Sequence, residues 1–275
     1  MAPRIIETGT SELLCSIEGG VATLTLNRPE KRNALSENLT PALRTMLIDL
    51  DLDSEVRCLV VTGAGKSFCS GGDLSGLGDA ESFSESKMSE TDRIDQLKER
   101  QRTLTYRLYN FSKPTIAAIS GPAAGAGLCI ALACDLRIAS TTSFMTTGYS
   151  RIGLSGDYGG TWLLPRLIGP AIAKELYFSS RRVTAAEALR IGLINEMVPD
   201  QEFGARIKEY ALSIARGSPI AIKLIKENIN AGFGDNLEDS LDREAINLMT
   251  CARTDDHREA VRAFIEKREP AFVGS

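Results

Sequence analysis

Two glycine-rich segments, FCSGGDL at residues 68–74 and GPAAGAG at residues 121–127, dominate the first half of the chain. Each follows a short apolar run, at residues 58–62 and 115–119, typical of a strand covered on both faces. Small residues where a strand passes into a helix leave backbone N–H groups pointing outward at the positive end of the helix dipole. Two such turns side by side can direct two N–H groups at one oxygen and form an oxyanion hole. The alternative is a pair of tight turns packed together for steric reasons, and spacing alone leaves both interpretations open.

The first hundred residues alternate strands and helices. A β-rich run at 21–26 ends at the turn signal Asn27-Arg28-Pro29, and leucines at helical spacing follow Ser36, a candidate N-cap. Further elements are expected at residues 96–110, 128–133, 135–138, 184–191 and 194–198. Apolar residues three and four apart predict helices throughout the last part of the chain. The pattern predicts an α/β protein with repeated ββα-like units in residues 1–200 and a helical region in residues 201–275.

Composition limits the possible functions. The chain has 275 residues, 43% of them hydrophobic, which is enough for a full-size core. With 32 basic and 36 acidic residues the net charge is −4, so a nucleic-acid partner is not expected. A segment at residues 75–93 is rich in Ser, Glu, Asp and Gly, which predicts a mobile loop or a frayed helix near a binding site.

Histidine and cysteine usage argues against metal chemistry. His257 is the single histidine, and the six cysteines are scattered without a CxxC pair. These counts predict no metal site, no redox cofactor and no disulfide framework, and they indicate a reducing compartment. No apolar run is long enough to cross a membrane, and the first residues lack the apolar core of a signal peptide. We therefore expect a cytoplasmic protein with no membrane partner.

Several polar residues are candidates for a site, each with a structural alternative. Asp157, flanked by glycines, is either a proton-transfer base or a turn or N-cap aspartate, and spacing alone favours the second. Tyr149 either donates a hydrogen bond in the same pocket or packs. Cys129 lies among apolar residues and His257 in a charged segment, so we expect a core thiol and a surface helix residue. GAGKS at 63–67 imitates a phosphate-binding loop, but Val60 stands where that motif needs glycine.

The order and spacing of several motifs resemble the crotonase, or enoyl-CoA hydratase/isomerase, superfamily from about residue 12 to the last few residues. The motifs are NRPEKRNAL at 27–35, FCSGGDL at 68–74, PTIAAI at 114–119, the glycine turn at 121–127, Cys134-Asp135, GGT at 159–161, AAEA at 185–188 with GLIN at 192–195, and AFIEKR at 263–268.

The resemblance implies a spiral of ββα units followed by a C-terminal helical trimerisation region, with trimers that often pair into hexamers. It implies an acyl-CoA thioester as ligand. The backbone N–H groups of Gly72 and Ala126 match the oxyanion hole of the superfamily, whose shared chemistry is stabilisation of a thioester enolate. The remaining positions implied are the CoA-binding residues Lys31, Arg32, Ala34, Ser70, Asp73 and Leu74.

Departures from the superfamily pattern bear on the reaction. A standard hydratase has two glutamates, at the places of Cys129 and Tyr149, and neither a thiol nor a phenol is a good base near pH 7. Some isomerases of the superfamily, including enzymes that resemble those of phenylacetate breakdown, carry one aspartate in a P-D-x-G-G-T-W context, which GDYGGTW at 156–162 matches. Within this fold the resemblance therefore favours Asp157 as the catalytic residue.

These observations predict an acyl-CoA enzyme of isomerase type without a separate cofactor. Asp157 would move a proton, Gly72 and Ala126 would hold the thioester oxygen, and Tyr149 would line the acyl pocket. One alternative is an enoyl-CoA hydratase that uses Asp157 and a water held by Tyr149, and another is a decarboxylase that needs no strong base. The alternative from a different class is a CoA-binding scaffold with little turnover.

Overall fold

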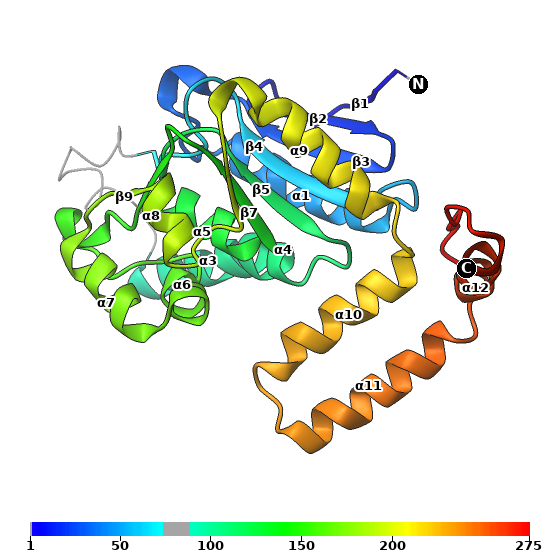
Figure 1. The fold of residues 1–275 in the computed structure, drawn as a ribbon. Helices are drawn as coiled ribbons and strands as arrows, with labels where there is room; N and C mark the ends of the chain where they lie inside the picture. The colour runs from blue at the N-terminus through cyan, green and yellow to red at the C-terminus, as the bar shows by residue number, and fades with distance from the viewer. Residues whose placement is uncertain (1, 74–88) are drawn as a thin grey trace.

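The computed structural model describes residues 2–73 and 89–275 (Figure 1). The predicted loop at 75–93 lies outside the described residues except for its last five positions. There Ser89 caps helix α3 (Glu90–Gln101), because its hydroxyl accepts from the Asp92 N–H and Asp92 interacts in return with the Ser89 N–H.

A seven-stranded sheet forms the centre of the molecule. Its strands, in spatial order, are β1 (Arg4–Ile6), β2 (Leu13–Glu18), β3 (Val21–Leu26), β4 (Cys58–Gly63), β5 (Thr115–Ile119), β7 (Leu136–Ser140) and β10 (Glu196–Val198). The β1–β2 and β2–β3 pairs are antiparallel, and all later pairs in this sheet are parallel. The parallel arrangement brings the ends of β4 and β5, and the glycine-rich turn after each, to one edge of the sheet.

A small three-stranded sheet continues the chain from the second glycine turn. It consists of β6 (Ala123–Ala124), β8 (Phe144–Thr146) and β9 (Val183–Thr184). β8 lies between the other two strands, parallel to β6 and antiparallel to β9. This sheet carries the chain toward Tyr149, so it links the second turn to the segment that holds the candidate tyrosine.

Helices cover one face of the central sheet with an apolar core. Besides α3, the described helices and helical turns of the body before residue 200 are η1 (Pro29–Lys31), α1 (Leu39–Leu52), η3 (Arg102–Tyr106), α4 (Arg107–Tyr109), α5 (Ala126–Ala133), η4 (Tyr149–Ile152), α6 (Gly160–Ile168), α7 (Pro170–Ser179) and α8 (Ala185–Arg190). In α1 the predicted stripe of Leu39, Leu43 and Leu47 is at most 1% exposed. The Ser36 hydroxyl accepts from the Leu39 N–H at 3.0 Å, but the N-cap of α1 is Asn38, two residues after the predicted cap.

The opposite face of the sheet is covered by α9 (Asp200–Ala215), which crosses the strands in Figure 1. Phe203, Ile207 and Ala211 pack there against apolar residues of the strands, among them Val60. α9 thus begins at the predicted boundary of residue 200 but belongs, by packing, to the body of the molecule. The division at residues 200 and 201 stays a prediction.

The last three helices form an arm that projects from the body (Figure 1). They are α10 (Pro219–Gly232), α11 (Leu237–Cys251) and α12 (Asp255–Glu266). α10 buries no residue, and it reaches the body through polar contacts such as Lys226 Nζ to Asp135 Oδ2 at 2.7 Å. The α/β class predicted from the sequence, with helices after the sheet, is confirmed.

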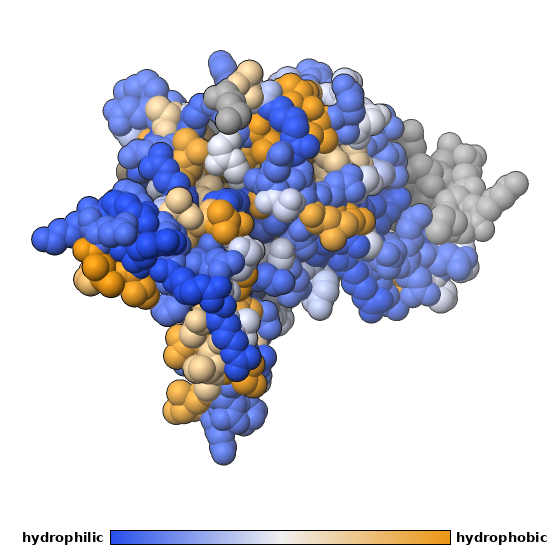
Figure 2. Space-filling model, turned by 90° about the vertical axis from the view of Figure 1, so that its right-hand side faces the viewer, coloured by the Kyte–Doolittle hydropathy of each residue, from blue (hydrophilic) through white to orange (hydrophobic). Residues whose placement is uncertain are grey.

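Apolar side chains of the arm are exposed along all three helices, and orange patches interrupt the hydrophilic surface on the side seen in Figure 2. Among them are Ile225 (55%), Ile229 (60%), Leu237 (74%), Ile246 (68%), Leu248 (69%), Phe264 (85%) and Ile265 (74%). The body of the molecule therefore leaves apolar side chains of all three arm helices uncovered.

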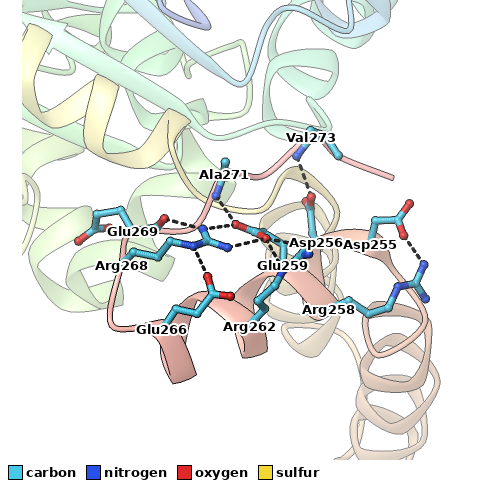
Figure 3. Close-up of polar contacts among 10 residues, drawn as sticks. All are labelled: Asp255, Asp256, Arg258, Glu259, Arg262, Glu266, Arg268, Glu269, Ala271 and Val273. Atoms are coloured by element: carbon cyan, nitrogen blue, oxygen red, sulfur yellow. Dashed lines mark hydrogen bonds and ion pairs between the residues drawn. The ribbon is translucent and has the colours of Figure 1, made fainter.

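Ion pairs hold the end of the chain against α12 (Figure 3). The Glu259 carboxylate accepts from Arg268 and from the Ala271 N–H, and these bonds lower its pKa to about 2. Asp256, 1% exposed, accepts from the Val273 and Gly274 N–H groups at 2.8 and 3.1 Å. Hydrogen bonds and ion pairs therefore hold the C-terminal segment against α12, while apolar side chains of the arm remain exposed.

Candidate active site

The two glycine-rich turns lie against each other. The Ala124 N–H donates to Cys69 O at 2.9 Å, and the Cys69 N–H donates to Pro122 O at 3.2 Å. Gly71 has φ +93°, and a Cβ there would lie 2.9 Å from Ala124 O. Only glycine fits this position without strain, because both the backbone angle and the close approach exclude a side chain. Steric packing is thus one part of the arrangement.

The paired turns also present two backbone donors. Ala126 is the first residue of α5, and Gly72 pairs with Leu35 in an isolated bridge. Neither the Gly72 N–H nor the Ala126 N–H donates to an acceptor within residues 2–73 and 89–275. A Cβ built on the neighbouring Gly71 would lie 3.4 Å from Ala126 N, so the two turns that carry these amides are in contact. The two turns therefore carry, side by side, two backbone N–H groups that have no acceptor among the described residues.

The segment after β3 packs directly on the first glycine turn. The Leu35 N–H donates to Gly71 O at 2.8 Å, and the Ser70 N–H donates to Arg32 O at 3.0 Å. Asn33 is fully buried, and its amide donates to Ala64 O and Ser67 O at 2.9 and 2.7 Å. The residues predicted to bind CoA on this segment are therefore placed by hydrogen bonds to the turn that carries Gly72.

Arg28 also stabilises the contact between the segment after β3 and the first glycine turn, although no motif in the sequence marked its side chain as functional. Its guanidinium donates to Ala34 O at 2.7 Å and pairs with Asp73 at 3.1 Å and with Glu12 at 3.4 Å. Its side chain is 12% exposed. The Asn27-Arg28-Pro29 signal predicted a turn, but the partners of Arg28 come from distant parts of the chain, which no local pattern reveals.

A cavity of about 400 Å³ opens beside the two turns. Six of the predicted site residues line it, namely Ser70, Gly72, Asp73, Ala126, Tyr149 and Asp157. Lys31 and Arg32 are exposed and Ala34 is 5% exposed, and these three do not line this cavity. Leu74 lies outside the described residues. Leu35, Arg44 and Tyr158 also line the cavity, and the sequence did not indicate them.

Asp157 lies inside this cavity in a hydrogen-bonded group. The Tyr149 hydroxyl donates to Asp157 Oδ1 at 2.5 Å. Cys129 Sγ lies 3.5 Å from the Tyr149 hydroxyl and 3.5 Å from Asp157 O. Asp157 precedes α6, but the N-cap of that helix is Gly159, and no side chain caps it. The alternative of an N-cap aspartate is therefore wrong, because the carboxylate is directed to Tyr149.

Burial shapes the protonation of this group. It raises the pKa of Asp157 above its ordinary value, and the hydrogen bond from Tyr149 acts in the opposite direction. Burial also raises the pKa of Tyr149, and the nearby Cys129 and Asp157 add to this effect. The Cys129 thiol, 1% exposed, has a pKa raised to about 12, mainly by burial. Tyr149 is thus a hydrogen-bond donor, and Cys129 is a neutral thiol packed in the core as predicted.

Glycines and one strained residue hold the Asp157 loop. Gly156 and Gly159 have φ +109° and +76°, and Tyr158 has φ +48° although it carries a side chain. A positive φ costs a non-glycine residue free energy, and such residues gather at functional sites. A backbone hydrogen bond also holds the loop, because the Gly160 N–H donates to Asp157 O at 3.2 Å.

The structure also shows where His257 and the cysteines lie. His257 is exposed on α12, as predicted. The six cysteines are free thiols. Within the described part of the chain no three His, Cys, Asp or Glu side chains gather as a metal site would require, and no helix there is long and apolar enough to cross a membrane.

Known proteins resemble the chain over nearly its whole length. The family model for enoyl-CoA hydratase/isomerase matches residues 16–275. A short-chain-enoyl-CoA hydratase of Clostridium acetobutylicum is 37% identical over 255 residues, which cover 92% of this chain and 94% of the relative. A 1,2-epoxyphenylacetyl-CoA isomerase of Escherichia coli is 35% identical over 263 residues, covering 95% and 98%. The crystal structure of an enoyl-CoA hydratase from Bacillus anthracis superposes with a TM-score of 0.88 at 33% identity, covering 96% of this chain and all of that one.

The fold and the cavity, together with these likenesses, define an enzyme of the crotonase superfamily. Within it, the chain belongs to the enoyl-CoA hydratase/isomerase family, whose members process acyl-CoA. The resemblance predicted from the sequence motifs is confirmed.

Proposed function

We propose that the chain moves the double bond of an enoyl-CoA thioester, with Asp157 as the single proton-transfer residue. The observation that carries this proposal is the Tyr149–Asp157 hydrogen bond of 2.5 Å inside the cavity lined by Gly72 and Ala126. The positions where a standard hydratase has two glutamates hold Cys129 and Tyr149. A relative named as an isomerase, at 35% identity, supports the same reaction class.

The proposed reaction begins when the Asp157 carboxylate removes a proton from C2 of a 3-enoyl thioester. The C–H electron pair moves toward the thioester carbonyl, and negative charge develops on its oxygen. Two backbone N–H groups, of Gly72 and Ala126, stabilise that charge, and one such donor commonly contributes about 10²–10³ in rate. The protonated Asp157 then returns the proton at C4, the new double bond forms between C2 and C3, and the carboxylate is regenerated.

The raised pKa of Asp157 suits both halves of this cycle. A base with a pKa nearer to the working pH accepts a carbon-bound proton more readily and still releases it afterwards. The Tyr149 hydroxyl orients the carboxylate by donating to one of its oxygens, which leaves the second oxygen for the proton. The reaction is redox-neutral and needs no metal or separate cofactor, so exhaustive chelation should leave turnover unchanged.

Hydration is the second candidate. The same Tyr149–Asp157 pair supports it, because a hydroxyl and a carboxylate can together hold one water. A relative named as a short-chain-enoyl-CoA hydratase, at 37% identity, supports it as well.

One experiment separates the candidates: the protein is mixed with 3-enoyl-CoA or 2-enoyl-CoA, and the absorbance of the conjugated enoyl group is followed. A gain on the 3-enoyl substrate supports isomerisation, and a loss on the 2-enoyl substrate supports hydration. No change on either contradicts both and favours a different reaction, such as decarboxylation, or a CoA-binding scaffold.

We also propose that the helical region at residues 201–275 carries, in α10, α11 and α12, the surface through which the chain assembles into trimers or hexamers. The support is the apolar surface of α10, α11 and α12, which the body of the molecule leaves exposed. The CoA part of the substrate is proposed to contact Lys31, Arg32, Ala34, Ser70 and Asp73, as the family resemblance implies.

A further inference from the structure

Arg44 lines the cavity with a guanidinium group that is not fully hydrogen-bonded. It lies on α1 four residues after Thr40, and both residues line the cavity from the same face of the helix. Arg44 is half-buried, and its Nε and Nη2 atoms are shielded from solvent. Within the described residues these two donors have no hydrogen-bond acceptor. The structure thus places an incompletely paired guanidinium at the wall of the proposed acyl site.

The carboxylates of the cavity are engaged elsewhere. Glu37 pairs with Arg100 at 3.2 Å, and Asp73 pairs with Arg28 at 3.1 Å. Asp157 accepts from Tyr149 at 2.5 Å. Guanidinium N–H groups that are shielded from water without an acceptor cost free energy. Proteins ordinarily offset this cost with a carboxylate that accepts two parallel hydrogen bonds from the planar guanidinium. The Nε and Nη2 atoms of Arg44 are themselves covered, so a carboxylate in the cavity would meet the part of the Arg44 side chain that lines it.

Tyr158 links Arg44 to the catalytic loop. Its ring is 8% exposed and lines the cavity, and its backbone directly follows Asp157. Burial raises the pKa of the Tyr158 hydroxyl, while the positive charges of Arg44 and Arg100 and a hydrogen bond with the Arg44 side chain lower it, so both guanidinium groups lie near this ring. A group bound by Arg44 would therefore share the cavity with the carbon atoms that react at Asp157.

We propose that Arg44 is a specificity-determining residue that binds a carboxylate at the far end of the acyl group. The preferred substrates are then CoA thioesters of dicarboxylic acids, with one carboxyl in the thioester and the other facing Arg44. This proposal rests on the proposed function, because it takes the cavity as the site of the acyl group. Arg100 adds a second positive charge at the cavity, although Glu37 compensates it.

The test uses pairs of saturated thioesters, which bind without being isomerised. Each pair has the same chain length of about four to eight carbons, one member ending in a methyl group and the other in a carboxylate. Dissociation constants are measured by isothermal titration calorimetry with the full-length protein. For at least one length the carboxylate member should bind about 10- to 100-fold more tightly, the usual contribution of charge-assisted hydrogen bonds.

The variant Arg44→Met should remove this preference and leave the affinity for the methyl-ended thioester within about twofold, since Met retains the apolar stem. Arg44→Lys retains the positive charge but cannot donate two parallel hydrogen bonds, so it should give an intermediate preference for the carboxylate-ended thioester. The matched control is Arg190→Met, at an exposed arginine that pairs with Glu187 outside the cavity and should retain the full preference.

Two results would overturn the role of Arg44 and leave the proposed reaction intact: equal binding of both members at every length by the wild type, or a preference that survives in Arg44→Met. Failure of all thioesters to bind overturns the proposed function as well. If Arg44→Met does not fold, the wild-type pairs and Arg44→Lys still test whether Arg44 selects a carboxylate.

Discussion

The body of the molecule and its C-terminal arm use apolar residues in opposite ways. In the body, Leu43, Val61 and Ile119 are at most 1% exposed between the sheet and its helices. In the arm, Ile246 and Phe264 are 68% and 85% exposed. The few arm residues that are buried include the polar Asn247 and Asp256. The body therefore covers its apolar residues within one chain, whereas the apolar face of the arm stays exposed.

The largest effect is expected from Asp157→Asn in the body. The amide is isosteric with the carboxylate but cannot accept the C2 proton, so turnover of 3-enoyl-CoA should fall by roughly 10²–10⁴, the usual contribution of a positioned acid–base group. Steady-state kinetics measure this loss. The matched variant Cys129→Ala, in contact with the same pair, should retain most of the turnover because the thiol packs in the core.

Stability gives Asp157→Asn an independent control. The folded-state pKa of Asp157 is raised, so the ionised carboxylate opposes folding at neutral pH, and its removal should not lower the melting temperature. The assembly state should also stay unchanged, since the Asp157 side chain lines the cavity and is not part of the exposed apolar surface of the arm. An active Asp157→Asn together with an inactive Cys129→Ala would remove Asp157 from the mechanism.

The paired turns provide the next largest effect. Gly71→Ala introduces a Cβ 2.9 Å from Ala124 O at a backbone angle that disfavours side chains. We expect a loss of about 1–3 kcal/mol in the free energy of unfolding, the usual cost of such strain, and a fall in turnover as the Gly72 and Ala126 amides separate. Denaturant titration and kinetics measure both.

Gly72→Ala is the control for that prediction, because a Cβ on Gly72 meets nothing within 4 Å. It should cost much less stability than Gly71→Ala. Equal stability of the two variants would show that the close approach of the turns is not a constraint.

The arm should control assembly and leave the body folded. Light scattering should give a mass near three or six times 29.7 kDa for the wild type. The double variant Ile246→Asp and Phe264→Asp should lower this mass toward one chain, because burying each apolar side chain contributes about 1.5–3 kcal/mol and a buried charge opposes association. The circular dichroism spectrum should remain that of a folded protein.

Leu52→Asp is the matched variant in the body, where Leu52 is 80% exposed at the end of α1. It should leave the mass unchanged. A wild type that stays monomeric at micromolar concentration would contradict the assembly proposed for the arm.

The smallest effect concerns pH. Asp157 must be ionised to accept a proton, so kcat/KM should fall as the pH decreases through its raised pKa. Tyr149→Phe removes the hydrogen bond that lowers this pKa, so the acidic limb should move to higher pH. A profile that is unchanged by Tyr149→Phe would argue against Asp157 as the titrating group.

Local sequence pattern predicted the parts of this molecule that depend on local structure. The runs at 21–26 and 115–119 coincide with β3 and β5, and the glycine turns lie side by side as expected. The family motifs indicate Asp157, although spacing alone favours a turn residue there. Such features follow from residue type and periodicity.

Long-range packing accounts for the features that the sequence did not predict. Arg28 is held by Glu12 and Asp73, and Arg44 meets the cavity only because α1 lies beside the Asp157 loop. The periodicity of α9 resembles that of the arm helices, but α9 covers the sheet and the arm does not. Periodicity gives the apolar face of a helix and says nothing about which surface covers it.

The most direct test of Asp157 as the single proton carrier follows the proton itself. A 3-enoyl-CoA carrying deuterium at C2 is converted in ordinary water, and the 2-enoyl-CoA formed early in the reaction is analysed by NMR and mass spectrometry. Because one shielded carboxylate removes the deuteron and returns it, part of the product should carry deuterium at C4. Product formed at the wild-type rate with no deuterium at C4 would contradict transfer by Asp157 alone.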